Sequence, residues 1–153
     1  MSHLYDQVVK AVATSLAGLA TTGPRVFVDK DHPLADDEVN GLVVTELQDR
    51  VVQTSANRPR ILTIDLLLIV SIKAKAPTSA DGNAAAVSRQ ILLEVVQRLF
   101  GPTADVTLGG IAKFISYGGS DRDPDEENQD VVTRHVTIVA RLQTRETSFE
   151  VSA

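Results

Sequence analysis

The segment from Arg60 to Lys75, RILTIDLLLIVSIKAK, constrains the fold more than any other part of the chain. Its even-numbered positions from Leu62 onward are all apolar, whereas its odd-numbered positions mix isoleucine and leucine with threonine, aspartate, serine and lysine. Alternate side chains of a strand point to opposite faces of a sheet, so this pattern predicts a long strand with one face in the core. The other face is too apolar for plain solvent exposure and too polar for a core, which indicates a sheet face that meets another subunit.

Length and composition place the chain in the globular class. With 153 residues, 43% of them hydrophobic and 23% charged, we expect a single domain spanning residues 1–153. The absence of cysteine excludes disulfides, thiolate zinc sites and a cysteine nucleophile, and it fits a cytosolic product. A net charge of −5 and few aromatic residues disfavour nucleic acid or an anionic membrane as a tight partner. No apolar run is long enough to span a bilayer, and no secretory signal is visible.

Two amphipathic helices are predicted from apolar residues that recur every three or four positions. The first runs from Leu4 to Leu19, with Ser2 as its N-cap. The second runs from about Asp81 to Phe100, is capped by Thr78 or Ser79, and is ended by a Gly-Pro pair.

Strand patterns separate and follow these helices. They occupy residues 25–28, 42–53, 60–75, 106–117 (one or two short strands interrupted by Gly109-Gly110) and 131–144. The turn residues TSANRP join the second and third of these segments into an extended β-hairpin. The order of elements predicts an α+β fold, a mostly antiparallel sheet with two helices packed on one face.

The acidic run from Gly118 to Asp130 is tested first as a calcium site. Asp121, Asp123 and Asp125 match the first three ligand positions of an EF-hand loop. Glu126 replaces the glycine that the sharp turn needs, and a valine stands at the closing glutamate position. We therefore interpret the run as a solvated hairpin tip. The Gly118-Gly119 pair is read as a turn or a bulge.

No cluster of residues looks like a catalytic centre, so we expect no catalytic residue, no cofactor and no metal site. His32 and His135 are interpreted as surface or interface histidines, because nothing in the sequence places a serine or a second histidine beside either. Asp65 is a carboxylate among apolar neighbours, which could be a perturbed acid. We favour an ion pair with Arg134 or Arg141 on a facing strand or subunit, which makes these three residues candidates for a subunit interface.

The layout resembles the tail terminator (minor tail protein U-like) family of long-tailed bacteriophages. The resemblance spans nearly the whole chain and is carried by the N-terminal helix, by RVFVDKDHPLADDEVNGLVV, by the hairpin ending in LTIDLLLIVSIKA, by the alanine-rich second helix and by VTRHVTIVARLQT. It implies a structural, non-enzymatic virion protein that forms a homo-oligomeric ring, commonly a hexamer, at the head-proximal end of the tail tube. Such a ring stops tube polymerisation and provides the head-attachment surface.

The resemblance also implies partners and a location. The partners are further copies of the chain, the tail tube protein and a head-completion or connector protein, without a membrane. The location is the virion tail or neck, with the host cytoplasm during assembly. DNA passes through the lumen without specific binding, and acidic loops suit such a channel because carboxylates repel phosphates. We therefore expect Asp36, Asp37 and Glu38, and likewise Asp121, Asp123, Asp125, Glu126 and Glu127, to face the lumen or the tube rim.

Two other interpretations stay open at the level of sequence. A neck or head-completion subunit, which joins head to tail, differs from a terminator in what it touches. A small ligand-binding or enzymatic α+β domain would use a pocket between the sheet and the helices, with His135 or Asp65 beside its ligand.

Overall fold

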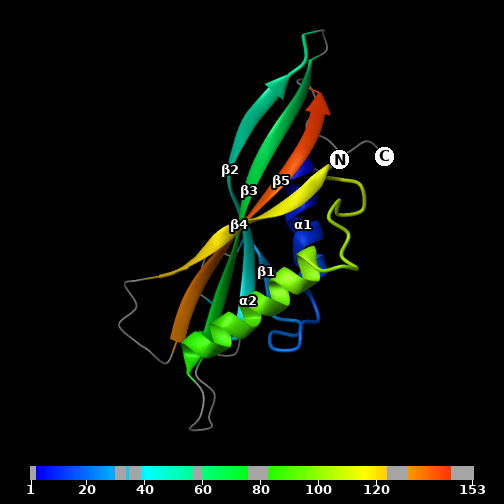
Figure 1. Ribbon diagram of the computed structural model, residues 1–153. Helices are drawn as coiled ribbons and strands as arrows, with labels where there is room; N and C mark the ends of the chain where they lie inside the picture. Colours follow the sequence, from blue (N-terminus) through cyan, green and yellow to red (C-terminus); the bar gives the residue numbers. More distant parts are fainter. Residues whose placement is uncertain are drawn as a thin grey trace.

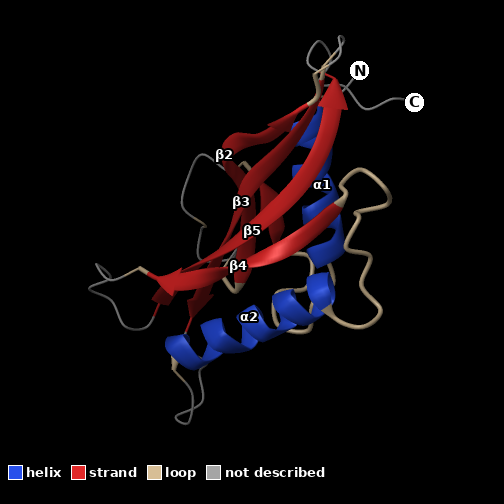
Figure 2. Cartoon of the chain, turned by 45° about the horizontal axis from the view of Figure 1, so that its top comes forward, coloured by secondary structure: helices blue, strands red, loops and turns tan. Residues whose placement is uncertain are grey.

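The computed structural model describes residues 3–29, 34, 39–56, 60–75, 83–123 and 131–145. These residues form an α+β fold, in which two helices cover one face of a five-stranded, mostly antiparallel sheet (Figures 1 and 2). The predicted fold class is confirmed. The elements in chain order are α1 (Leu4–Leu16), β1 (Val26–Val28), β2 (Gly41–Thr54), β3 (Ile61–Lys75), α2 (Ala84–Phe100), β4 (Phe114–Arg122) and β5 (Val131–Arg145).

Both helices are shorter than their apolar patterns predict. The ring of His3 caps the start of α1 by accepting a hydrogen bond from the Tyr5 backbone N–H. At its other end the helix stops at Leu16, before the predicted end at Leu19. The side chain of Asn83 caps α2 by accepting a hydrogen bond from the Ala86 backbone N–H at 2.8 Å. An asparagine at this position satisfies an otherwise unpaired helical N–H, so the second helix begins at its alanines. The predicted caps at residues 2, 78 and 79 lie outside the described residues.

The strands follow the order β1-β2-β3-β5-β4, so β5 lies between β3 and β4. The β2 and β3 strands form the predicted extended hairpin, paired from Gly41 opposite Lys73 to Thr54 opposite Leu62. The short β1 strand runs parallel to β2 and pairs with it only as far as Val44, whereas the other neighbours are antiparallel.

The strand prediction at residues 106–117 is confirmed for residues 114–117 and wrong for residues 106–113. The carboxylate of Asp105 accepts hydrogen bonds from the backbone N–H groups of Thr107 and Gly109, which holds the start of this segment in turns. The strand begins only at Phe114 and continues to Arg122, so it takes in residues that the sequence assigned to the acidic loop. The register shifts between Tyr117 and Gly119, which confirms the predicted bulge.

The core lies between the helices and one face of the sheet. Every even-numbered side chain of β3 from Leu62 to Ala74 is buried. These side chains share one hydrophobic cluster with Val8 and Val12 of α1 and with Ile91 and Val95 of α2. Each large aliphatic side chain buried in this way contributes about 1.5–3 kcal/mol. Burial of this one face fixes the register. Among the described residues, no helix covers the opposite face of the sheet.

Candidate assembly surfaces

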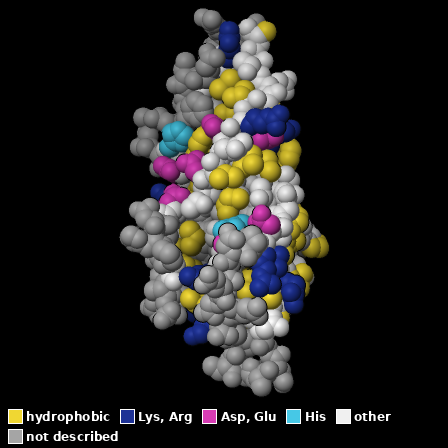
Figure 3. All heavy atoms as spheres, turned by 90° about the vertical axis from the view of Figure 1, so that its left-hand side faces the viewer, with side chains coloured by type: hydrophobic (Ala, Val, Ile, Leu, Met, Phe, Trp, Pro, Cys, Tyr) yellow, Lys and Arg dark blue, Asp and Glu magenta, His cyan; other side chains and the backbone are white. Residues whose placement is uncertain are grey.

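The face of the sheet that the helices do not cover is here called the open face. The odd-numbered side chains of β3 and β5 point to it, and the strand register adds alternate residues of β2 and β4. Figure 3 shows hydrophobic side chains distributed along the length of the molecule between charged ones. The open face carries Val43, Thr45, Gln48, Arg50, Thr63, Asp65, Leu67, Ile69, Ser71, Lys73, Phe114, Ser116, Asp121, His135, Thr137, Val139 and Arg141.

The centre of the open face is apolar. Leu67 of β3 lies opposite Val139 of β5, and Ile69 lies beside them, opposite Thr137. All four are half-buried in the single chain. An apolar centre with polar groups on both sides is the usual anatomy of a protein–protein contact.

One side of this centre holds the ion pair that the sequence predicted for Asp65. Arg141 donates hydrogen bonds from Nε and Nη2 to the two carboxylate oxygens of Asp65, at 2.8 and 2.9 Å. These bonds, together with the charges of Arg141 and Arg50, hold the pKa of Asp65 below its ordinary value. The Arg141 guanidinium also lies 5.5 Å from the ring centre of Phe114, within cation–π range. The pair is formed within one chain, and its part in a subunit interface stays a prediction.

The alternative partner, Arg134, lies on the other face of the sheet. Its Nε donates a long hydrogen bond of 3.4 Å to Ser88 of α2, and it sits opposite the buried Ile72. Arg134 occupies an even-numbered position of β5, as the core residues of that strand do. Its side chain therefore cannot reach Asp65 on the open face.

The expectation that no serine lies beside His135 is wrong. The Ser71 hydroxyl is 3.0 Å from His135 Nδ1, and Asp121 lies opposite His135 on β4. Ser71, His135 and Asp121 lie in one row across the sheet because of the strand register, which cannot be read from the sequence. No hydrogen bond or ion pair joins Asp121 to His135 in the described part of the chain, so the row lacks the linked geometry of a serine–histidine–aspartate triad.

The acidic residues predicted to face a lumen are only partly described. Asp121 is exposed near the end of β4, and the backbone N–H of Asp123 donates to the Thr133 carbonyl. His32 and the acidic residues at positions 36–38 and 125–127 lie outside the described residues. A lumen or rim position for these carboxylates remains a prediction.

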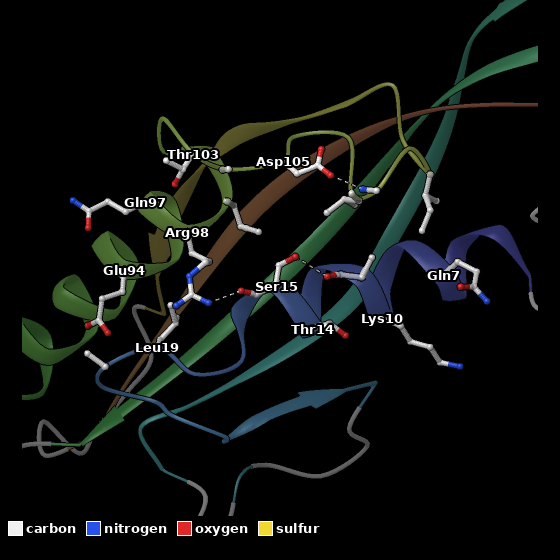
Figure 4. A pocket seen from close by; sticks show the side chains of 17 residues that line it. Gln7, Lys10, Thr14, Ser15, Leu19, Glu94, Gln97, Arg98, Thr103 and Asp105 are labelled. Carbon is white, nitrogen blue, oxygen red and sulfur yellow. Dashed lines mark hydrogen bonds between the residues drawn. The ribbon is translucent and has the colours of Figure 1, made fainter.

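A groove of about 880 Å³ lies between α1, the second half of α2 and the segment 103–111 (Figure 4). Arg98 points across it and donates hydrogen bonds to the carbonyls of Ser15 and Ala17 at the end of α1. Glu94 accepts hydrogen bonds from both the backbone N–H and the hydroxyl of Thr21. These two charged side chains hold the end of α1 and the segment after it against α2, so their place in the groove is explained by structural contacts.

No group of three or more histidine or acidic side chains that could hold a metal ion is found within the described ranges. In the same residues, neither helix has the length and apolar character needed to cross a membrane.

Comparison with known proteins gives little. No protein-family model and no curated protein matches the chain. Among solved structures, a similar chain comes from the virion of a native gene transfer agent (GTA) particle. The match covers 93% of this chain and 92% of that chain, at 16% identity and a TM-score of 0.46. At these values no function can be transferred from that chain to this one.

Proposed function

We propose that this chain is a structural virion protein that closes side by side with copies of itself into a ring. The ring would sit at the head-proximal end of a phage tail tube, stop tube polymerisation and offer the surface to which the head attaches. Its neighbours would be the tail tube protein and a head-completion or connector protein. The chain would act by shape and contact, without catalysis, within the virion after assembly in the host cytoplasm.

The observation that carries this proposal is the open face of the sheet. A half-apolar face that also carries the charged pair of Asp65 and Arg141 fits what the sequence pattern of β3 predicts, a surface that meets another subunit. Three strands of about 14 residues, at about 3.3 Å per residue and 4.8 Å between strands, cover about 700 Å². This approaches the roughly 800 Å² per partner of a standard protein–protein interface.

The ring form and the tail location have separate support. A closed ring covers strand edges that would otherwise invite aggregation, and the sheet has an outer strand on each side. The tail location rests on the resemblance of the chain's sequence segments and layout to tail terminators, as does the expectation of a hexamer.

Deletion of the coding sequence from a particle-producing genome tests the proposal, with negative-stain imaging of the products. Overlong tail tubes would support termination. Tubes of normal length that fail to join heads would instead support the neck or head-completion role. Normal particles in normal yield would overturn both.

A further inference from the structure

The open face cannot build a ring by packing on its own copy. Two identical faces that pack on each other are related by a two-fold axis, and such a contact is complete once two copies have joined. A ring of more than two copies needs each copy to present two different surfaces, one to each neighbour. If the open face is the subunit contact of the proposed ring, a second surface of the same chain has to fit against it.

The outer edge of β2 carries a group of exposed apolar side chains away from the open face. Leu47, Val51 and Val52, here called the β2 edge, are 60%, 51% and 41% exposed. Because β1 pairs with β2 only as far as Val44, no described strand lies beside this part of β2 (Figure 1). Other exposed hydrophobic residues off the open face, such as Leu93 of α2, occur one at a time along the described chain, which is ordinary for a protein surface.

The backbone of the β2 edge suits contact through side chains better than the addition of a strand. The register of β2 against β3 shifts twice, and Leu47 and Val52 occupy the irregular positions. Bulges of this kind interrupt the regular row of hydrogen-bonding groups that an added strand would need. A partner of this edge would therefore cover it with an apolar face.

The apolar stretches of the β2 edge and of the open face are similar in length. On the open face, Phe114 lies opposite Arg141 of β5, and Ile69 lies opposite Thr137. From 137 to 141 is four residue steps, or about 13 Å at about 3.3 Å per residue. The β2 edge runs from 47 to 52, five steps, or about 16 Å. Charged residues of both signs border each stretch, so apolar contact and length define the match.

We propose that the β2 edge of one copy packs on the apolar centre of the open face of the next copy, against Leu67, Ile69 and Val139. This inference rests on the proposed function and names the contact that would build its ring. The occupant is a second copy because one chain carries both members of the pair, an apolar edge beside which no described strand lies and an apolar face that no described helix covers. The open face, at about 700 Å², offers close to the area that one partner of a stable contact buries.

Cysteine cross-linking in assembled particles tests the contact, because the sequence contains no cysteine. A chain that carries both Val51→Cys and Ile69→Cys should form a ladder of disulfide-linked multimers under mild oxidation, because each copy would be linked to both neighbours. Neither single variant should cross-link. The matched control is Leu93→Cys combined with Ile69→Cys, which should give no ladder, since Leu93 is 49% exposed and Val51 is 51% exposed.

The outcomes separate the contact from the proposed function. Dimers from Ile69→Cys alone would mean that open faces pack on each other, and they would overturn the inference. Particles that contain the doubly substituted chain but give no ladder would also overturn it. Both results leave the proposed function standing. Normal particles after deletion of the gene would instead defeat the proposed function, whatever the cross-links show.

A substitution at Leu47 gives a second measurement that needs no oxidation. Leu47 is 60% exposed, so Leu47→Asp should leave the urea unfolding midpoint of the purified chain nearly unchanged. A carboxylate pressed against an apolar face is costly, so the yield of complete particles should fall by at least about tenfold. Leu93→Asp is the control and should leave the yield unchanged. A normal yield from Leu47→Asp, beside defective particles from the deletion, would overturn the contact.

Discussion

Asp65 of β3 and Arg141 of β5 lie opposite each other on the open face, and two hydrogen bonds join their side chains. The side chain of Asp65 is only 18% exposed, so its charge is partly withdrawn from water and depends on the guanidinium. Replacement by asparagine keeps the size and removes the charge. We expect Asp65→Asn to lower the free energy of unfolding by about 1 kcal/mol at neutral pH, measured by urea titration.

The same pair predicts how stability responds to acid. The pKa of Asp65 is lower in the folded chain than in the unfolded chain, so its stabilising contribution is present above the unfolded value. It is lost as the pH falls through the lower, folded value. We expect the difference in unfolding free energy between wild type and Asp65→Asn to shrink across this acidic range. A difference that stays constant down to strong acid would contradict the assignment.

Glu46 predicts the opposite sign. Its pKa is raised by burial and by Asp29 and Asp6, so the folded chain binds this proton more tightly than the unfolded chain does. Protonation of Glu46 stabilises the folded chain fully below the pKa of this group in the unfolded chain. The contribution is lost as the pH rises through its pKa in the folded chain. Glu46→Gln should therefore raise the thermal midpoint of the isolated chain at neutral pH. An unchanged or lower midpoint would argue against crowding of these carboxylates.

Substitutions at two adjacent residues of β3 can distinguish its buried face from its open face. Leu66 is fully buried under the helices, and Leu67 is half-buried on the open face. We expect Leu66→Ala to cost about 2–5 kcal/mol in urea unfolding, because it leaves a cavity. Leu67→Ala should cost clearly less in the isolated chain and is the matched control. Equal costs would mean that both faces are core.

The start of α2 supplies a fifth test. Asn83→Ala removes the side-chain oxygen that accepts from the Ala86 N–H and should cost about 1 kcal/mol in thermal or urea unfolding. Asn83→Asp retains an acceptor and should leave most of the stability in place. If both substitutions cost the same, the cap is not what fixes the start of this helix.

The regular part of the fold could be predicted because burial imposes strict periods. The alternation in β3 and β5 and the stripe in each helix are visible in the sequence, and so is the turn between β2 and β3. The end of α1 and the position of β4 could not be predicted. They depend on local contacts, such as the carboxylate of Asp105 binding nearby N–H groups, that overrule the apolar pattern.

The candidate surfaces show the same division. Charge limits the predicted partner of Asp65 to Arg134 or Arg141. The strand register decides between them, because Arg141 lies on the same face of the sheet as Asp65 and Arg134 lies on the other. The contact of Ser71 with His135 depends on which residues stand opposite each other, which is a property of strand pairing. The exposure of the apolar side chains of β2 could not be predicted from the sequence. Bulges at Leu47 and Val52 break the alternation from which the two faces of a strand are predicted.

The position of β5 between β3 and β4 has a consequence for how the chain matures. Residues 131–145 pair with the preceding strand, residues 114–122, on one side and with residues 61–75, made much earlier, on the other. Pairing over such long sequence separations slows folding. On the ribosome, the β2–β3 hairpin therefore exposes the unpaired edge of β3 until residues 131–145 have emerged.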